Sequence, residues 1–206
     1  MNYKPKILAF AGSLRENSYN KRVVKIAAEG ARSAGAEVNY IDLRDYPMPI
    51  YNADEHAANG FPEAALKFQR LLGAHEGLLI SSPEYNASLP GGLKNAIDWA
   101  SRQSDEFGQI EVFKGKTAAI TTASPGSFGG IRCLNHLRSV LTIMQVNVLP
   151  TEIAVTFVRE KFEGDGEEMT DEKMKGILQN LGASLAESLR KTRGEVKAEK
   201  KSADFR

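Results

Sequence analysis

Short apolar runs alternate along this chain with longer segments whose apolar residues recur at helical spacing. Runs of this kind, bounded by turn residues, are typical of strands buried on both faces of a parallel sheet. Strands that alternate with helices pair in parallel through right-handed crossovers. The pattern therefore predicts an α/β fold, a doubly wound three-layer sandwich around a five-stranded parallel sheet. We expect the strands at residues 7–12, 36–42, 77–81, 117–123 and 146–158.

The segments between these runs carry the apolar spacing of amphipathic helices. In the helix expected over residues 91–101, Lys94 and Asp98 have the i,i+4 spacing of an ion pair. The last helix is expected to begin near a Thr170-Asp171-Glu172 cap. We expect the five helices at residues 19–34, 61–72, 91–101, from the turn ending at 130 through 144, and about 172–189.

A single domain accounts for the length of 206 residues. Nothing in the first 190 residues has the composition of a polar linker between two cores. We therefore expect residues 1–190 to form one domain. Residues 191–206 are rich in basic residues and poor in apolar ones, which predicts a frayed C-terminal tail.

Charge and composition exclude several classes of protein. A net charge of +1 provides no overall field to attract nucleic acid or anionic lipid. No stretch approaches the roughly 18 apolar residues of a membrane span, and the N-terminus has too few apolar residues for a signal peptide. We expect a cytoplasmic protein without nucleic-acid binding or membrane insertion.

Cysteine and histidine are too sparse for a metal centre or a disulfide framework. Cys133 is the only cysteine, which fits a reducing compartment, and its helical neighbours Leu134 and Leu137 predict a small core residue. His56, His75 and His136 are scattered along the chain. We therefore expect no metal site.

The loop after the first strand has the features of a phosphate site. In open parallel sheets, ligands bind beyond the carboxyl ends of the strands. Here a helix N-terminus supplies backbone N–H groups, Ser13, Ser18 and Asn20 supply short polar side chains, and Arg15 supplies a positive charge. The dinucleotide and P-loop glycine patterns are absent, and so is a loop cysteine. A terminal monophosphate such as that of FMN fits this loop. The alternative is that Ser18 and Asn20 only cap the helix while Arg15 is solvated.

The loop after the third strand combines an aromatic ring with amide groups. Its residues are Pro83, Glu84, Tyr85 and Asn86. An isoalloxazine ring needs such a mixture, because one edge is apolar and the other accepts and donates hydrogen bonds. Taken alone, the tetrapeptide also fits a turn that begins at proline.

Together, the two loops resemble the NADPH-dependent FMN reductase family, which includes quinone, chromate and azo reductases of flavodoxin-like fold. The resemblance rests on Ser13-x-Arg15-x-x-Ser18-x-Asn20 and on the stretch from Pro83-Glu84-Tyr85-Asn86 to Trp99, and it covers roughly residues 6–155. Ala87 is a departure, because many members carry glycine there. The resemblance implies the strand order 2-1-3-4-5 of flavodoxin-like sheets.

The resemblance also implies cofactor-binding roles for particular residues. It assigns Ser13, Arg15, Ser18 and Asn20 to the FMN phosphate and Pro83 through Asn86 to the flavin ring. It places Ser124 and Gly126, in the glycine-rich turn after the fourth strand, against the flavin. Outside that motif, Met48 and Tyr51 follow the second strand in a proline-rich loop. We expect these two residues to cover the substrate space, the alternative being ordinary surface packing.

The activity implied by the resemblance is an NAD(P)H-dependent oxidoreduction with bound FMN. Hydride passes from NADPH or NADH to FMN and then to small acceptors, which gives ping-pong kinetics. The acceptors open to such a site are quinones, chromate, azo compounds, ferric complexes and free flavin. Because the flavin performs the redox chemistry, no catalytic side chain is required.

Other interpretations remain open from the sequence. A flavodoxin-type electron carrier or a flavin-based sensor would bind FMN without turning over NAD(P)H. Ile97 and Trp99 either complete the core or form a self-association patch. For the helix as a whole we favour the patch, because the family resemblance implies a homodimer or homotetramer.

Overall fold

The computed structural model describes residues 3–164, 166 and 168–203, with side chains through Thr192. Its five-stranded sheet has the order β2-β1-β3-β4-β5, and every neighbouring pair is parallel. This confirms the α/β fold and the strand order expected from the sequence. The strands are β1 (Lys6–Ala11), β2 (Glu37–Ile41), β3 (Gly77–Ser81), β4 (Thr117–Ala123) and β5 (Asn147–Val155).

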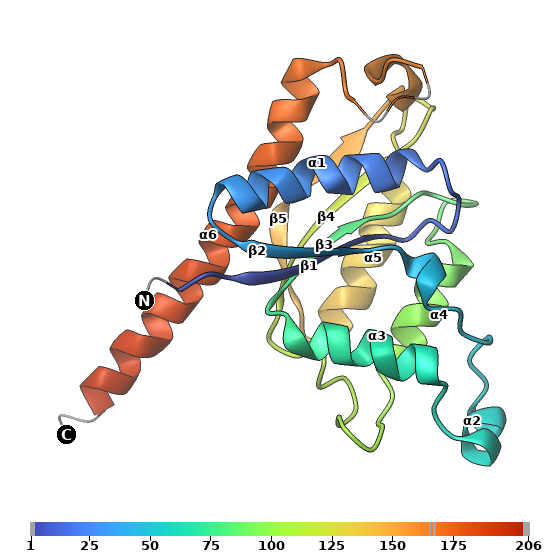
Figure 1. Ribbon diagram of the computed structural model, residues 1–206, viewed down its shortest axis with the longest axis vertical. Coiled ribbons are helices and arrows are strands. Elements are labelled where there is room, and N and C mark those ends of the chain that lie inside the picture. Colours follow the sequence, from blue (N-terminus) through green and yellow to red (C-terminus); the bar gives the residue numbers. More distant parts are fainter. Residues whose placement is uncertain (1–2, 165, 167, 204–206) are drawn as a thin grey trace.

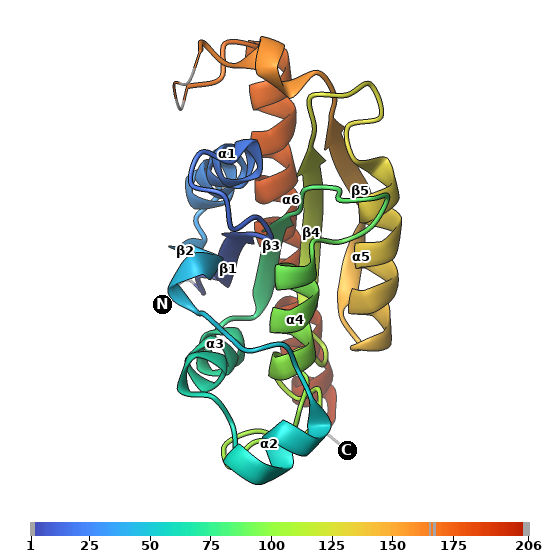
Figure 2. The ribbon, with the colours of Figure 1, turned by 90° about the vertical axis from the view of Figure 1, so that its right-hand side faces the viewer.

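Helices cover both faces of the sheet, so that the molecule has three layers (Figures 1 and 2). One face packs against α1 (Tyr19–Ser33) and α6 (Glu172–Ala203). The other packs against α3 (Glu63–Ala74), α4 (Gly91–Ala100) and α5 (Ile131–Ile143). Because successive strand residues point to opposite faces, Ile7 of β1 faces the first layer and Leu8 the second.

Two glycines let the backbones of α1 and α6 approach closely. A Cβ added to Gly30 would lie 1.9 Å from the carbonyl oxygen of Gln179, and one added to Gly182 would lie 1.8 Å from that of Ala27. Neither position has room for a side chain. The close contact fixes α6 against α1, whose N-terminus borders the candidate site.

The segment between β2 and α3 differs from the loop expected there. It contains the 3-10 turn η1 (Leu43–Asp45) and the helix α2 (Ala53–Asn59). The α2 helix begins where the side chain of Asn52 accepts a hydrogen bond from the N–H of Asp54 at 2.9 Å. None of its residues is buried, so the apolar periodicity that reveals other helices is missing.

The fifth strand is shorter than the one expected over residues 146–158. β5 ends at Val155, and the 3-10 turn η2 (Val158–Lys161) follows. Phe157, between them, has φ +47°, a left-handed conformation that does not continue a strand. The turn brings residues after β5 to the edge of the sheet where the candidate site lies.

The α6 helix begins at the predicted cap. Asp171 accepts a hydrogen bond from the N–H of Met174 at 2.9 Å through its side chain. The helix then runs to Ala203 and projects from the body of the molecule, whereas fraying was expected from residue 191 (Figure 1). Lysine, glutamate and alanine are good helix formers, which explains a helix without apolar periodicity. Residues 204–206 lie outside the described residues, and the boundary at residue 190 stays a prediction.

The self-association patch expected at Ile97 and Trp99 is wrong for these two side chains. Each is 2% exposed within a single chain, and Trp99 donates a hydrogen bond from its indole nitrogen to the carbonyl of Pro49 at 2.7 Å. They complete the core instead. The outer face of α4 carries the predicted ion pair between Lys94 and Asp98, at 2.7 Å.

Candidate functional site

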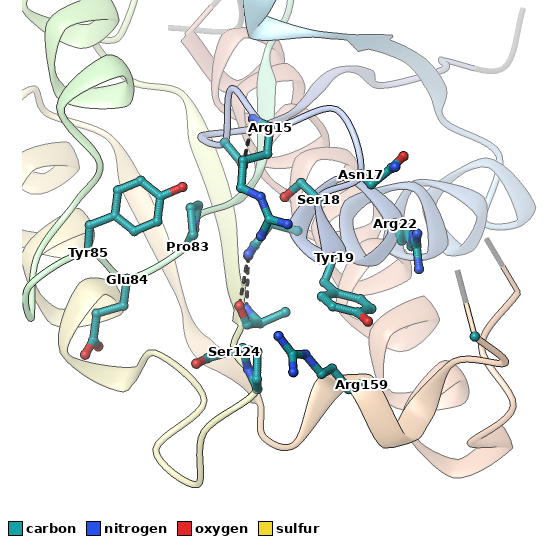
Figure 3. A pocket seen from close by; sticks show the side chains of 15 residues that line it. Arg15, Asn17, Ser18, Tyr19, Arg22, Pro83, Glu84, Tyr85, Ser124 and Arg159 are labelled. Atoms are coloured by element: carbon teal, nitrogen blue, oxygen red, sulfur yellow. Dashed lines mark hydrogen bonds between the residues drawn. The ribbon is translucent and has the colours of Figure 1, made fainter. Parts of the chain in front are cut away.

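A cavity of about 640 Å³ lies at the carboxyl ends of the strands (Figure 3). The loops after β1, β3 and β4, which the sequence analysis singled out, come together around it. The turn η2 after β5 adds a fourth wall. The lining residues are Ser13, Arg15, Asn17, Ser18, Tyr19, Asn20, Arg22, Pro83, Glu84, Tyr85, Ala123, Ser124, Pro125, Arg159 and Gly164.

The loop after β1 presents the N-terminus of α1 to this cavity. Ser13 and Ser18 line the cavity as buried residues, and Arg15 lines it from an exposed position. Ser18 is the N-cap residue of α1 by position, but its side chain makes no capping hydrogen bond. A helix N-terminus with adjacent hydroxyl groups and a guanidinium is suited to binding a phosphate. Ser18 therefore does not cap the helix through its side chain in this structure, and phosphate binding by this loop stays a prediction.

Asn20 has a different place in the site from its neighbours. Its amide nitrogen donates to the carbonyl of Ala123 at 3.0 Å, and its amide oxygen accepts from the N–H of Ala123 at 3.0 Å. The same oxygen accepts from the hydroxyl of Ser81 at 2.8 Å. Asn20 thus joins the ends of β3 and β4 beneath the cavity. These hydrogen bonds hold the strand ends together under the site. Contact between Asn20 and a phosphate stays a prediction.

The loop after β3 presents Pro83 and Tyr85 to the cavity, whereas the carboxylate of Glu84 turns away from its centre (Figure 3). Glu84 accepts hydrogen bonds from the backbone N–H groups of Arg132 at 3.0 Å and Cys133 at 3.2 Å. Both N–H groups belong to the first turn of α5, where a negative charge is stabilised by the helix dipole. Glu84 therefore ties its loop to α5.

The same loop closes in a tight turn. The backbone groups of Tyr85 and Ser88 exchange two hydrogen bonds of 3.0 Å each. Between them Asn86 and Ala87 have φ values of +49° and +64°. Glycine adopts this left-handed region without strain, so a glycine in place of Ala87 would fit the same turn. Asn86 belongs to the turn but not to the residues that line the cavity.

The turn after β4 contributes Ser124 to the cavity wall. Its backbone carbonyl accepts a hydrogen bond from the N–H of Val158 at 3.1 Å, which places η2 beside this turn. Gly126 is not a lining residue, but its N–H donates to the hydroxyl of Ser124 at 3.2 Å. The two residues therefore lie together, with Ser124 nearer to the cavity.

Several lining residues were missed by reasoning from the sequence. Asn17, Tyr19 and Arg22 belong to the loop and helix already considered, but only their side-chain directions place them in the cavity. Arg22 lies with its guanidinium 5.0 Å from the centre of the Tyr19 ring. Arg159 follows the last strand, so the rule that ligands bind beyond strand ends was the available signal.

Met48 and Tyr51 are not among the residues that line this cavity. Met48 lines a second cavity, of about 310 Å³, together with Leu14 and Asn95. Tyr51 packs edge-on against Trp99, with ring centres 5.0 Å apart, and against His56 at 6.1 Å. The structure thus gives Tyr51 a packing role, and contact of either residue with a substrate stays a prediction.

Cys133 is a core residue, as expected. Its thiol is fully buried and donates to the hydroxyl of Ser82 at 3.2 Å. Burial raises the pKa of this thiol to about 11, which keeps it protonated at neutral pH. Within the described part of the chain, no three His, Cys, Asp or Glu side chains are grouped so that they could hold a metal ion.

The donor set of the cavity fits FMN. One end offers hydroxyl groups, a helix N-terminus and guanidinium groups for a phosphate. The other end offers Pro83 and the ring of Tyr85 for an aromatic system. Glu84, the one carboxylate among the lining residues, is paired with Arg132 at 3.2 Å, which limits its repulsion of an anionic ligand.

Comparison with known proteins agrees with this geometry. Residues 5–160 match the model of the family described as NADPH-dependent FMN reductase. An NAD(P)H-dependent FMN reductase of Pseudomonas aeruginosa is 37% identical over 190 residues, which cover 92% of this chain and 97% of that protein. A quinone reductase of Escherichia coli is 35% identical over 187 residues, covering 90% and 94% of the two chains.

Solved structures show the same fold. The flavoenzyme FerB of Paracoccus denitrificans, an NAD(P)H:(acceptor) oxidoreductase, superposes with a TM-score of 0.76 at 30% identity. The superposition covers 91% of this chain and 98% of that one. None of the helices formed by the described residues is long and apolar enough to cross a membrane. The chain belongs to the NADPH-dependent FMN reductase family and is an oxidoreductase with FMN as cofactor and NAD(P)H as cosubstrate.

Proposed function

We propose that this protein oxidises NAD(P)H and reduces small diffusible acceptors, with quinones as the first class to test. The observation that carries the proposal is one cavity at the strand ends, where Ser13, Arg15 and Ser18 at the N-terminus of α1 lie with the loop of Pro83 and Tyr85. The name of the quinone reductase of Escherichia coli supports the choice of acceptor, and that of the Pseudomonas aeruginosa protein supports NAD(P)H as the donor. Chromate, azo compounds, ferric complexes and free flavin are further candidates.

The residues of the chain bind and orient the cofactor in this proposal. Bound FMN supplies the hydride and electron transfer that no protein side chain here provides. Ser13, Ser18, Arg15 and the N-terminus of α1 bind the phosphate. Pro83 and Tyr85 contact the ring, and Glu84 holds their loop on α5.

Backbone N–H groups of two turns are placed to stabilise negative charge on a bound flavin. Backbone N–H groups of Glu84 and Asn86, or of the turn after β4, would stabilise negative charge on a reduced flavin bound here. Such donors are fixed before the reaction begins, so they need no reorganisation when charge develops. No catalytic acid or base is assigned to a side chain.

The cosubstrate and the acceptor are proposed to use the same open space in turn. Ping-pong kinetics follow, because the first product leaves before the acceptor enters. Initial rates measured at several quinone concentrations against NADPH will then give parallel double-reciprocal lines. Intersecting lines would contradict a shared space.

The decisive test is steady NAD(P)H oxidation by the purified, FMN-loaded protein with a quinone acceptor. We expect turnover that depends on protein concentration and on FMN. A flavodoxin-type carrier or a flavin-based sensor would retain bound FMN but oxidise neither NADH nor NADPH at a steady rate.

A homodimer or homotetramer located in the cytoplasm belongs to the same proposal. Exposed apolar side chains support self-association, since Phe128, Ile131 and Ile143, on α5 and the turn before it, are 63%, 42% and 74% exposed. Light scattering at micromolar concentration tests it. A monomeric mass would remove the oligomer from the proposal and leave the activity untouched.

A further inference from the structure

The cavity contains an arginine that the family motif does not include. Arg159 lies on η2, beyond the end of β5, and its side chain extends toward the space between Ser124 and Tyr19 (Figure 3). Arg15 lines the same cavity from the loop after β1. The two positive charges thus come from separate elements.

Two arginines in the described structure have guanidinium groups without a hydrogen bond, ion pair or ring contact to other described residues. They are Arg15 and Arg159, and both line this cavity. Each other arginine whose side chain is described has at least one such contact. Guanidinium groups that lack an internal partner and face one cavity are suited to an anionic ligand.

The turn that carries Arg159 is well anchored. Val158, the residue before it, is fully buried, and its N–H donates to the carbonyl of Ser124 at 3.1 Å. Lys161, two residues later, forms an ion pair with Asp171 at 2.6 Å. Phe162 is 4% exposed. Arg159 is therefore held at the cavity by packed neighbours on both sides, although its own side chain is exposed.

The hydrogen bonds of Asn20 limit what this residue can donate to a phosphate. Its amide oxygen accepts from Ser81 and Ala123, and one of the two N–H groups of its amide donates to Ala123, which leaves Asn20 at most one N–H for a phosphate. The hydroxyl groups of Ser13 and Ser18 can donate one hydrogen bond each. A phosphate dianion can accept more hydrogen bonds than these. A second guanidinium supplies both the donors and the balancing charge.

We infer that Arg159 is a further phosphate-binding residue of the FMN site and that it contacts the phosphate from the side opposite to Arg15. This inference rests on the proposed FMN site. Because a charge-assisted hydrogen bond to phosphate contributes more than a neutral one, its loss will weaken FMN binding by about tenfold. Riboflavin, which lacks the phosphate, will bind Arg159→Gln as it binds the unaltered protein.

The experiment titrates flavin-free protein with FMN and with riboflavin and follows the quenching of flavin fluorescence. Arg159→Gln is compared with the unaltered protein and with Arg70→Gln. Arg70 is an exposed arginine of α3 that pairs with Glu106 and does not line the cavity. Its replacement by glutamine changes the net charge by the same amount, but away from the cavity. Glu160→Gln, at the next residue of η2, controls for disturbance of the turn. We expect weaker FMN binding in Arg159→Gln alone, together with a smaller dependence of that binding on salt.

Three results would overturn the inference. Equal FMN affinity of Arg159→Gln and Arg70→Gln removes any contact with the phosphate. An equal loss of FMN and riboflavin binding, with Glu160→Gln unaffected, means that Arg159 does not act on the phosphate. Unchanged FMN affinity with a raised KM for NADPH, but not for NADH, assigns Arg159 to the cosubstrate's extra phosphate. Failure of the unaltered protein to bind FMN would instead refute the proposed function.

Discussion

The carboxylate of Glu84 accepts a hydrogen bond from the backbone N–H of Arg132 at 3.0 Å, which joins the loop after β3 to the first turn of α5. The side chain of Arg132 also contacts Glu84, at 3.2 Å, and lies 4.7 Å from the ring of Phe128 in the turn after β4. One carboxylate thus holds the positions of two loops that border the cavity.

Replacing Glu84 tests this coupling. Glu84→Ala removes the acceptor of the Arg132 N–H and one of the two acceptors of the Cys133 N–H, so we expect the free energy of unfolding to fall by about 1–3 kcal/mol. FMN binding will weaken as the loop loosens. Glu84→Gln retains an acceptor oxygen and will recover most of both losses. Urea unfolding and FMN titration measure them, and equal behaviour of the two variants would contradict the anchoring role.

Asn20 and Ser18 are neighbours in the motif but have separable roles. Asn20→Ala leaves buried polar groups of Ala123 and Ser81 without their partner, which costs about 2–4 kcal/mol of stability. Ser18→Ala removes a hydroxyl that makes no capping bond, so stability will change little while FMN affinity falls. Urea unfolding of the flavin-free variants distinguishes them. Equal destabilisation by both replacements would refute this assignment.

Asp42 makes the fold sensitive to acid. Burial of its carboxyl opposes ionisation, but hydrogen bonds from Arg44 and Lys21 outweigh that effect and lower its pKa from 3.8 to about 2. The ionised form therefore stabilises the fold above about pH 4, and this contribution is lost as the pH falls from about 4 to 2. We expect Asp42→Asn to cost about 1–2 kcal/mol at pH 7 and to flatten the stability profile in that range.

The burial of Lys21 explains why Asp42→Asn is expected to lower the stability of the fold. Its side chain is 7% exposed and lies 2.6 Å from the Asp42 carboxylate, so the replacement leaves a buried charge without its counter-ion. Glu63→Gln is the control, because Glu63 pairs with Lys67 at side chains that are 79% and 58% exposed. Urea unfolding at several pH values measures both variants. The same profile for both would show that the Asp42 pair is not the source of acid sensitivity.

Cys133 will resist thiol reagents in the folded protein. Its thiol is fully buried, and burial raises its pKa to about 11, so both access and the thiolate fraction are small at pH 8. A colourimetric disulfide reagent will modify the protein slowly in buffer and rapidly in denaturing urea. Fast modification of the folded chain would contradict this burial.

The sheet could be predicted from the sequence because buried strands are short, apolar and bounded by turns. The runs at residues 77–81 and 117–123 coincide with β3 and β4. α2 was not predictable in the same way, because it buries none of its residues and depends on a capping contact from Asn52. The self-association patch expected at Trp99 was wrong, because Trp99 is buried where the proline-rich loop packs on α4. The sequence pattern does not show that contact.

The candidate site was predictable where it depends on which residues follow a strand. The loop after β1 and Pro83–Tyr85 line one cavity for that reason, whereas their contacts with FMN stay a prediction. Side-chain direction was not predictable, since Asn20 points to strand ends and Glu84 points to α5. Tyr51 illustrates the same point, because a loop aromatic near the site packs on Trp99 instead. Sequence order gives the loops, whereas tertiary packing determines what each side chain contacts.

The absorbance spectrum of the purified protein under anaerobic conditions tests the central claim most directly. We predict a flavin band that NADPH or NADH bleaches and that a quinone then restores; after removal of the flavin, added FMN will restore the band. Absence of bound flavin after reconstitution with FMN, or a flavin band that neither NADPH nor NADH bleaches, would contradict an NAD(P)H-dependent FMN reductase.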